Sequence, residues 1–509
     1  MIEHGTRWVL RSGEQAALDR QAEEAGLPRD ALMESAGGNA ADWLTEHARP
    51  HRAVVLAGPG GNGGDALVVA RRLRADGVDV RTFLIPPVDK LSAATGRMLD
   101  RFAAAGATLS DIDDLTLALG DSDCAVDGLF GSGMSRPLEG AYREAVERLN
   151  DASIPTISLD LPSGLPADEG ALFGESVRAD ITLAMAFLKP AHLLYPAAGF
   201  CGNVAVVDVD YPASVLRNAV PWARVCEPAE IRDRLPVRPP DGHKGTFGRV
   251  LVVAGSEGMT GAAMLACGAA FRAGAGLVTL AAPTAVTPIL ETALPETIAI
   301  PLPETVDFEE PRLAEAMARA DVLAIGPGIS RSPAMIGRMR AFLEWFDRPV
   351  VIDADALRAL IGRDGLWESL AGRAILTPHP GEFAVLTNAS VEAIESARRD
   401  MVGRFAAERG CVLVLKGRPT AIGLPDGSVT LNPTGNDGLG TGGTGDVLCG
   451  LIAGFVAGGA ALPDAAIVGA YVHGLASEIY ARDRAARSLM ASDLIDVLPF
   501  ALGEVASCE

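Results

Sequence analysis

The chain has 509 residues, which is long for a single hydrophobic core and predicts two or three domains. Its formal net charge is −21, and this excess of acid argues against nucleic acid or an anionic membrane as a partner. Hydrophobic residues make up 49% of the chain, with 57 glycines and 33 prolines, which is typical of a globular α/β protein, so we expect a small-molecule ligand.

The first elements predict a βαβ unit. Residues from about 15 to 47 have a helical pattern, and a strand at 53–57 follows. A glycine-rich turn at 58–65 then leads through a helix to a second strand at 80–85. The turn has the spacing GxGxxG, but no acidic residue closes the second strand to hold a ribose, so the motif is a weak signal for a dinucleotide site.

Side-chain oxygens follow several predicted strands of this half. Asn62 and Asp65 lie in the glycine turn, where they could ligate a hard cation or a sugar hydroxyl, and an ordinary turn with a helix cap is the alternative. Later strands end at Asp127 and Asp160 and before Lys189. Loops at the carboxyl ends of parallel strands share one crevice, so we expect these groups to meet. There Asn62, Asp127 and Ser163 could share a monovalent cation, while Arg136 could hold a phosphate or be an exposed loop arginine.

This half resembles the NAD(P)H-hydrate epimerase domain, also called the YjeF N-terminal domain, over roughly residues 10 to 215. The resemblance is carried by GNGGDALVVAR, DGLFGSGMSRPL, DLPSG and FLKP. It implies that Asn62, Asp127 and Ser163 bind potassium and that Asp160 and Lys189 are candidates for proton transfer. It implies further that the hydrated dinucleotide is bound by Asn62, Gly63, Gly64, Asp65, Ala66, Gly131, Ser132, Gly133, Met134, Ser135, Arg136, Pro137, Tyr142 and Asp160. Family loops usually read GNNGGDG, so Gly61 and Ala66 are departures that bear on the rigidity of the loop.

A proline-rich stretch of mixed charge separates the two halves. It reads VPWARVCEPAEIRDRLPVRPPDG and predicts a linker with a short docking helix. We place the boundary at residue 225, with domains at 1–225 and 226–509. Strand-like segments alternate with helical ones after it, which predicts a second doubly wound α/β domain.

Polar residues again follow the strands of the second half. Lys416 could be a point charge for a nucleotide phosphate or a solvated loop lysine. His379 could contact the substrate, although a lone histidine is more often structural. The pair Asp353 and Asp355 could hold Mg²⁺ through water, and a solvated strand end explains both residues as well.

The loop from Asn432 to Asp446 is the candidate active-site loop. Its glycines let backbone N–H groups converge on an anion, and the apolar segment after it predicts a helix whose N-terminus adds partial positive charge. It is not a Walker P-loop, because Asp446 stands where that motif carries lysine. Asp446 could be a general base for phosphoryl transfer, and a helix cap is the alternative.

The second half is similar to the ribokinase-like superfamily, and specifically to the ADP- or ATP-dependent NAD(P)H-hydrate dehydratase, over roughly residues 230 to 505. The motifs are HKGTFGRVLVVAG, MTGAA, RAGAGLVT, AIGPG, VIDADAL, TPHPGEF, KG and NPTGNDGLGTGGTGD, where Gly440 replaces a usual alanine. The resemblance implies that the hydrated dinucleotide is bound by Gly261, Ala262, Gly328, His379 and Asp446. It implies that the nucleotide, with Mg²⁺, is bound by Lys416, Gly417, Arg418, Pro419, Thr420, Asn436, Gly442, Gly443, Thr444 and Gly445.

Together the halves predict two doubly wound domains, a Rossmann-like epimerase followed by a ribokinase-like dehydratase that uses ADP or ATP to restore NADH or NADPH from its hydrates. The alternative is a ribokinase-like vitamin-precursor kinase fused to a Rossmann-like binding domain without turnover. Seven scattered cysteines without CxxC pairs, no signal-like N-terminus and an apolar run of only 447–462 predict a cytoplasmic protein that does not span a membrane. We also expect a homo-oligomer.

Overall fold

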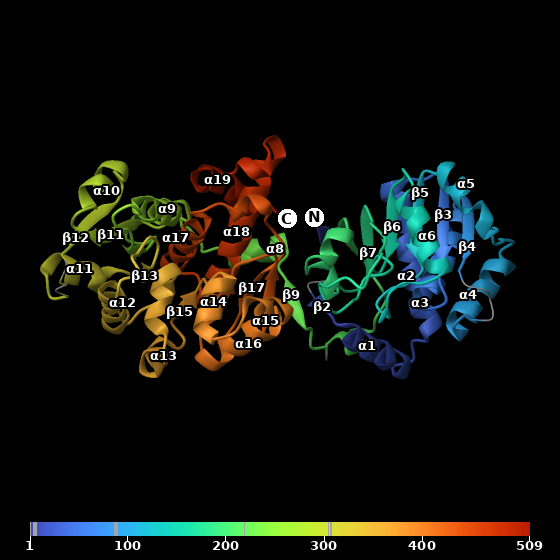
Figure 1. The fold of residues 1–509 in the computed structure, drawn as a ribbon, viewed down its shortest axis with the longest axis horizontal. Coiled ribbons are helices and arrows are strands. Elements are labelled where there is room, and N and C mark those ends of the chain that lie inside the picture. The colour runs from blue at the N-terminus through green and yellow to red at the C-terminus, as the bar shows by residue number, and fades with distance from the viewer. Residues whose placement is uncertain are drawn as a thin grey trace. The chain divides into compact units, whose positions relative to one another are not determined.

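The computed structural model describes residues 2–3, 8–85, 90–217, 219–303, 305 and 308–508. It divides into two compact units, Met1–Arg224 and Val225–Glu509. Each unit is built on its own largely parallel sheet with helices on both faces (Figure 1), which confirms the predicted pair of doubly wound α/β domains. We describe each unit separately.

The sheet of the first unit has the strand order β1-β8-β7-β6-β5-β3-β4, and all its neighbours are parallel. Its strands are β1 (Ile2–Glu3), β3 (Arg52–Ala57), β4 (Asp79–Leu84), β5 (Cys124–Gly128), β6 (Thr156–Leu159), β7 (Ile181–Met185) and β8 (Asn203–Val207). A separate strand, β2 (Trp8–Val9), pairs antiparallel with β9 (Ala223–Val225) through Trp8 and Arg224. Part of the stretch predicted as a linker is therefore a strand.

Alternation along β3 divides the first unit into two cores. Val55 faces the core formed with α2 and α3, whereas Val54 and Leu56 face the core formed with α5 and α6. The helices are α1 (Ser12–Glu24), α2 (Arg29–Trp43), α3 (Gly61–Ala75), α4 (Ala93–Ala104), α5 (Leu115–Gly120), α6 (Ala141–Asn150) and α7 (Ala213–Leu216). Shorter helical turns are η1 (Leu44–Ala48), η3 (Ile112–Asp114), η4 (Pro190–His192) and η5 (Ala197–Phe200).

The second unit contains the strand order β12-β11-β10-β13-β14-β15-β16-β17-β18, parallel as far as β16 and antiparallel from β16 to β18. The strands are β10 (Arg249–Val253), β11 (Leu277–Pro283), β12 (Ile298–Leu302), β13 (Val322–Ile325), β14 (Val350–Ile352), β15 (Ala374–Leu376), β16 (Val412–Leu415), β17 (Thr420–Gly423) and β18 (Val429–Asn432). Two sequence segments, VVIDADAL and AILTPHPGEF, predict longer strands than the structure contains: β14 ends before the 3-10 turn η6 (Ala354–Leu360), and β15 ends before a helix that begins at Pro380.

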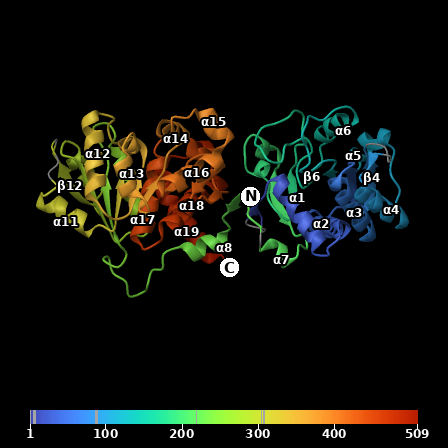
Figure 2. The ribbon, with the colours of Figure 1, turned by 90° about the horizontal axis from the view of Figure 1, so that it is seen from below.

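Helices cover both faces of this sheet, and α8 lies against α18 and α19 (Figure 2). The helices are α8 (Pro228–Arg234), α9 (Thr260–Arg272), α10 (Thr287–Ala293), α11 (Pro311–Arg319), α12 (Pro333–Trp345), α13 (Asp364–Leu370), α14 (Pro380–Thr387), α15 (Val391–Ser396), α16 (Arg398–Arg409), α17 (Thr444–Ala457), α18 (Leu462–Asp483) and α19 (Ala491–Ser507). Two further 3-10 turns are η7 (Asp437–Gly440) and η8 (Ala486–Ser488).

The apolar run after Asp446 is the buried helix α17, packed directly on α9. A Cβ atom added to Gly450 would lie 2.0 Å from the carbonyl oxygen of Ala266, and one added to Gly454 would lie 2.6 Å from that of Ala270. Glycine is needed at both positions because the two helix backbones approach this closely. Within the described part of the chain, no helix has the length and apolar character needed to cross a membrane. All seven cysteines are free thiols, and six of them are buried.

Candidate active sites

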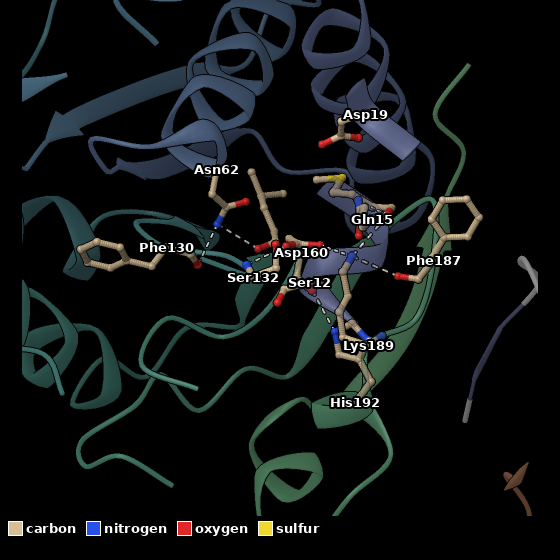
Figure 3. A network of polar contacts seen from close by, with 12 residues as sticks. Ser12, Gln15, Asp19, Asn62, Phe130, Ser132, Asp160, Phe187, Lys189 and His192 are labelled. Atoms are coloured by element: carbon tan, nitrogen blue, oxygen red, sulfur yellow. Dashed lines mark hydrogen bonds and ion pairs between the residues drawn. The ribbon is translucent and has the colours of Figure 1, made fainter. Parts of the chain in front are cut away.

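The centre of the first unit's site is an ion pair between Asp160 and Lys189. Asp160 follows β6 in the left-handed backbone region, with φ of +62°. One of its carboxylate oxygens accepts a hydrogen bond from the Ser132 N–H at 3.0 Å, and the other accepts one from the fully buried Lys189 ammonium. The ammonium also donates to the carbonyls of Phe187 at 3.0 Å and Met185 at 3.3 Å (Figure 3). The structure therefore brings the two candidates for proton transfer into direct contact.

The charges of this pair follow from its surroundings. Burial on its own raises the pKa of Asp160, but the charge and hydrogen bond of Lys189 outweigh burial and hold that pKa below its usual range. Asp160 is thus a carboxylate at neutral pH, paired with the Lys189 side chain. Within the protein, one can act as a base and the other as an acid.

His192 locks the pair in place, and sequence reasoning missed it. Its Nδ1 accepts a hydrogen bond from the Lys189 N–H at 3.0 Å, so Nε2 carries the proton and donates to the Asp160 carbonyl at 2.8 Å. Burial, and then the charge of Lys189, lower the pKa of His192 to about 4. The neutral ring ties the two backbones together. Its position three residues after Lys189, in the turn that begins at Pro190, is the one signal the sequence contains.

The three predicted potassium ligands meet around Phe130. The Asn62 amide donates to the Phe130 carbonyl at 2.9 Å, and the Phe130 N–H donates to the Ser163 hydroxyl at 2.9 Å. That hydroxyl in turn donates to the Asp127 carboxylate at 2.6 Å. The Asn62 Oδ1 is buried and has no hydrogen-bond partner among the described residues. A buried oxygen without a hydrogen-bond partner is a group that a cation can satisfy.

Two further carboxyl groups lie near the ion pair. Burial, followed by repulsion from Asp160 and Asp19, raises the pKa of Asp65 well above its usual range. Burial also raises the pKa of Asp19, which accepts a hydrogen bond from the Tyr211 hydroxyl. Asp19 and Tyr211 were not predicted, and no sequence pattern links α1 to a residue 192 positions away.

The predicted binding loops of the first unit have different surroundings. A Cβ atom on Gly131 would lie 2.7 Å from Asp160 Oδ2, so this glycine allows its loop to approach the ion pair. The ring of Tyr142 packs edge-on against Phe130, with 4.8 Å between the ring centroids, and Arg136 is exposed. The Ala66 side chain is completely buried against Gly128, so its contribution to binding is limited to its backbone. Ser132 donates its N–H to Asp160, whereas Gly133, Ser135 and Pro137 are exposed on the loop and Met134 is half-buried.

The centre of the second unit's site is Lys416, directly after β16. Its ammonium lies 2.9 Å from Asp353 Oδ1 and 3.9 Å from Glu382 Oε2. The Thr377 hydroxyl donates to the same Asp353 oxygen at 2.7 Å. A Cβ atom on Gly445 would lie 3.2 Å from Lys416 Nζ, so the ammonium sits against the glycine-rich loop. The predicted Lys416 and Gly445 are therefore neighbours.

Asp446 occupies the first turn of α17, beside this cluster. Burial first, and repulsion from Asp353 second, raise the pKa of Asp446 to about 7, although Lys416 opposes the shift. The helix begins after Gly443, with φ of +96° and no side-chain cap. A pKa near the working pH suits a general base and differs from that of a capping carboxylate, whose pKa falls.

The predicted substrate contacts of the second unit lie on three elements. Gly328, with φ of +63°, lies against the turn that begins α9: a Cβ atom there would be 2.6 Å from the Met259 carbonyl and 2.8 Å from Ala262 Cβ. Next to Ala262, Gly261 lies in the first turn of α9 and is exposed. His379 caps α14, since its Nδ1 accepts the Gly381 N–H at 3.0 Å. The Nε2 of its half-exposed ring lies 3.4 Å from Glu382 Oε1.

Two of the residues predicted to bind the nucleotide have side chains that are hydrogen-bonded within the protein. The Asn436 side chain accepts the Gly438 N–H at 3.0 Å and donates to the Ser477 carbonyl at 2.8 Å, and the Thr444 hydroxyl donates to the Leu439 carbonyl at 2.8 Å. These two side chains stabilise the conformation of the glycine-rich loop, so an anion would be bound by backbone N–H groups of that loop. Of the other predicted residues, Gly417, Arg418 and Pro419 follow Lys416 in the chain, Thr420 begins β17, and Gly442 and Gly443 lie directly before α17.

The structure separates the two acidic residues suggested for Mg²⁺. Asp353 contacts Lys416, whereas Asp355 contacts Arg331 at 2.9 Å. The described residues contain no group of three or more His, Cys, Asp or Glu side chains arranged to hold a metal ion. Asp355 is therefore engaged elsewhere.

Comparisons with known proteins match both halves. A family described as NAD(P)H-hydrate dehydratase matches residues 250–500, and one described as YjeF-related protein N-terminus matches residues 29–191. The bifunctional NAD(P)H-hydrate repair enzyme Nnr of Moorella thermoacetica is 39% identical over 97% of this chain and 96% of its own. The enzyme of the same name from Thermofilum pendens is 36% identical, with the same coverage of 97% and 96%.

Solved structures also match. The ADP/ATP-dependent NAD(P)H-hydrate dehydratase from Bacillus subtilis, co-crystallised with ATP and Mg²⁺, is 33% identical and covers 55% of this chain and 98% of its own, with a TM-score of 0.47.

Proposed function

The chain belongs to the family of bifunctional NAD(P)H-hydrate repair enzymes, and from that membership we propose the division of labour between its two sites. The first unit interconverts the R and S hydrates of NADH and NADPH, and the second dehydrates the S form at the expense of ADP or ATP. The observation that carries the proposal is 39% identity to a bifunctional relative over 97% of this chain. The ion pairs Asp160–Lys189 and Asp353–Lys416 provide a polar cluster in each unit. The alternative, a vitamin-precursor kinase fused to a binding module, is not favoured.

In the first unit, the proton-transfer groups are Asp160 and Lys189. Epimerisation at C6 breaks the bond to the hydroxyl and re-forms it on the other face of the ring, so a proton must be delivered on one face and removed on the other. The buried ion pair provides both a donor and an acceptor. Asn62, Asp127 and Ser163 would hold potassium, which would supply fixed positive charge beside the substrate.

In the second unit, Asp446 removes the proton of the substrate hydroxyl as that oxygen attacks the terminal phosphate of the nucleotide. The loop that begins α17 holds the transferring group through backbone N–H groups, and Lys416 balances its charge. Asp353 is the carboxylate placed to hold Mg²⁺ through water, and this ion would neutralise phosphate charge. Loss of the phosphate from C6, together with a proton from C5, then re-forms the double bond of the reduced nicotinamide.

The decisive experiment mixes the protein with NADH hydrate and either ADP or ATP and follows both the absorbance of NADH and free phosphate. Recovery of NADH with equimolar phosphate supports the dehydratase. A stable phosphorylated product without NADH would instead identify a kinase. Parallel assays with ADP and ATP show which nucleotide is preferred.

The first unit is tested with pure R hydrate and the variant Asp160→Asn, which keeps the shape of the side chain. We expect epimerisation to fall by roughly 10²–10⁴, the usual contribution of a positioned acid or base. Dehydration of the S hydrate by the same variant is the control and should be unchanged. Undiminished epimerisation would remove Asp160 from the mechanism.

The predicted homo-oligomer and cytoplasmic location stay predictions. The buried free thiols support a reducing compartment. Sedimentation of the purified chain tests the oligomer, and fractionation of cells tests the location.

A further inference from the structure

The second unit has a cavity of about 230 Å³ next to the dehydratase site. It lies between η6 and α14, together with the loop after β13. Its lining comprises Arg331, Ala354, Asp355, Leu357, Arg358, Ile361, His379, Gly381, Glu382, Val385 and Leu386. None of the mechanistic steps above uses it.

The cavity adjoins the reacting groups through two shared residues. Glu382 lines it and also lies 3.9 Å from Lys416 Nζ. His379 also lines it, and its Nε2 lies 3.4 Å from Glu382 Oε1. Only the hydrated nicotinamide of the proposed substrate reacts at Asp446, so the rest of the dinucleotide must lie on a surface that continues from this point.

One wall of the cavity is apolar and open to solvent. Ile361 and Val385 are 42% and 44% exposed, and Leu357 and Leu386 complete this wall. A volume of about 230 Å³ is below the roughly 300–1,000 Å³ of a site for a whole drug-sized ligand. It therefore suits one ring system, not an entire dinucleotide.

The other wall carries two arginines held by one carboxylate. Asp355 Oδ1 lies 2.9 Å from Arg331 Nε and 3.5 Å from Arg358 Nε. Both contacts use the Nε edge, so the terminal nitrogens of the two guanidinium groups have no hydrogen-bond partner within the described ranges. Asp355 balances one of the two charges. The two guanidinium groups therefore keep one net positive charge, although the chain as a whole carries −21. A pair of guanidinium groups of this kind is suited to bind a phosphate.

We propose that this cavity binds the adenosine half of the hydrated dinucleotide, with adenine against the apolar wall and a phosphate on Arg331 and Arg358. The proposal rests on the proposed function of the second unit and names a second anchor for its substrate. The two arginines act on binding and stand apart from the reacting atoms. Their removal should therefore change KM and leave kcat nearly unchanged.

The test measures dehydration of the S hydrates of NADH and NADPH at saturating ADP in Arg331→Ala, Arg358→Ala and the double variant. We expect KM to rise about tenfold in each single variant, in line with the loss of a charge-assisted hydrogen bond. A rise for both hydrates identifies the diphosphate as the bound group, and a rise for the NADPH hydrate alone identifies the 2′-phosphate. Arg363→Ala, an exposed arginine outside the lining, is the matched control and should retain the wild-type KM.

A second variant tests the apolar wall. Val385→Asp places a carboxylate opposite the arginines, and because Val385 is exposed the fold should tolerate it. We expect a rise in KM at least as large as that of Arg331→Ala.

An unchanged KM for both hydrates in the double variant of Arg331 and Arg358, with the wild type active, would overturn this subsite and leave the proposed function standing. A wild type that restores no NADH would instead overturn the proposed function.

Discussion

At the residue scale, Asp446 combines a raised pKa with a place beside the glycine-rich loop that begins α17. Its pKa is raised to about 7 by burial and by repulsion from Asp353. A base must be ionised, so the rate of dehydration should rise with pH until about 7 and then level off. Below that pH we expect about a tenfold loss per unit, measured as kcat/KM for the S hydrate. A flat profile between pH 5 and 8 would contradict the assignment of Asp446 as the base.

The same residue should carry a cost in stability. Its folded pKa lies above its unfolded value of 3.8, so ionisation is harder in the folded protein, and the penalty grows between about pH 4 and 7. Asp446→Asn should therefore raise the melting temperature at pH 8 and leave it unchanged near pH 4. A helix-capping carboxylate would give the opposite sign at pH 8, because its loss would remove a stabilising charge. Thermal unfolding at the two pH values separates the two roles.

The ion pair of the first unit can be tested in the same way. Lys189→Met removes the ammonium and leaves Asp160 buried without its counter-ion, which typically costs about 3–5 kcal/mol. We expect epimerisation to be lost and the first unit to unfold at a lower denaturant concentration. The double variant Lys189→Met with Asp160→Asn should regain part of this stability but no epimerase activity. Failure of the second change to restore any stability would show that the charge is not the cause.

At the scale of elements, the position of Asp446 depends on how closely α17 packs on α9. Gly450→Ala would place a Cβ atom 2.0 Å from the Ala266 carbonyl oxygen and force the helices apart. Overpacking of this kind typically costs about 1–3 kcal/mol. We expect a lower unfolding midpoint and weaker dehydratase activity with epimerase activity intact. Gly503→Ala in α19, where a Cβ atom has nothing within 4 Å, is the control and should be neutral or stabilising.

Some of this arrangement could be predicted from the sequence and some could not. Asp160 directly follows β6, and Lys189 lies in the loop after the neighbouring parallel strand β7, so their meeting follows from topology. The bond from His192 to the Asp160 carbonyl depends on a short turn whose geometry no periodicity reveals. Asp19 and Tyr211 meet through the packing of α1, which precedes the alternating strands and helices of the doubly wound fold. The pair β17 and β18 was not predicted, because TAIG and VTLN lack the continuous aliphatic run that marks the neighbouring strand β16, VLVL.

At the scale of the whole molecule, each unit has its own hydrophobic core and its own site. Activity of the two units should therefore be separable. With a mixture of R and S hydrates and ADP, Asp160→Asn should rapidly recover only the S fraction, and Asp446→Asn should recover none. Mixing the two variants should restore recovery of both, because the S hydrate released by one protein is a substrate for the other. Absence of complementation would show that the intermediate is not released.

The backbone conformation at Asp160 limits which amino acids can replace this residue. With φ of +62°, the position tolerates Asp, Asn and Gly far better than longer or branched residues. A mutation to Glu would keep the charge but meet a steric penalty, so selection cannot exchange one acid for the other here. A descendant that abandoned epimerisation would be expected to carry Asn or Gly at this position. Asn or Gly at this position would then indicate that the left-handed backbone conformation had been kept after the carboxylate was lost.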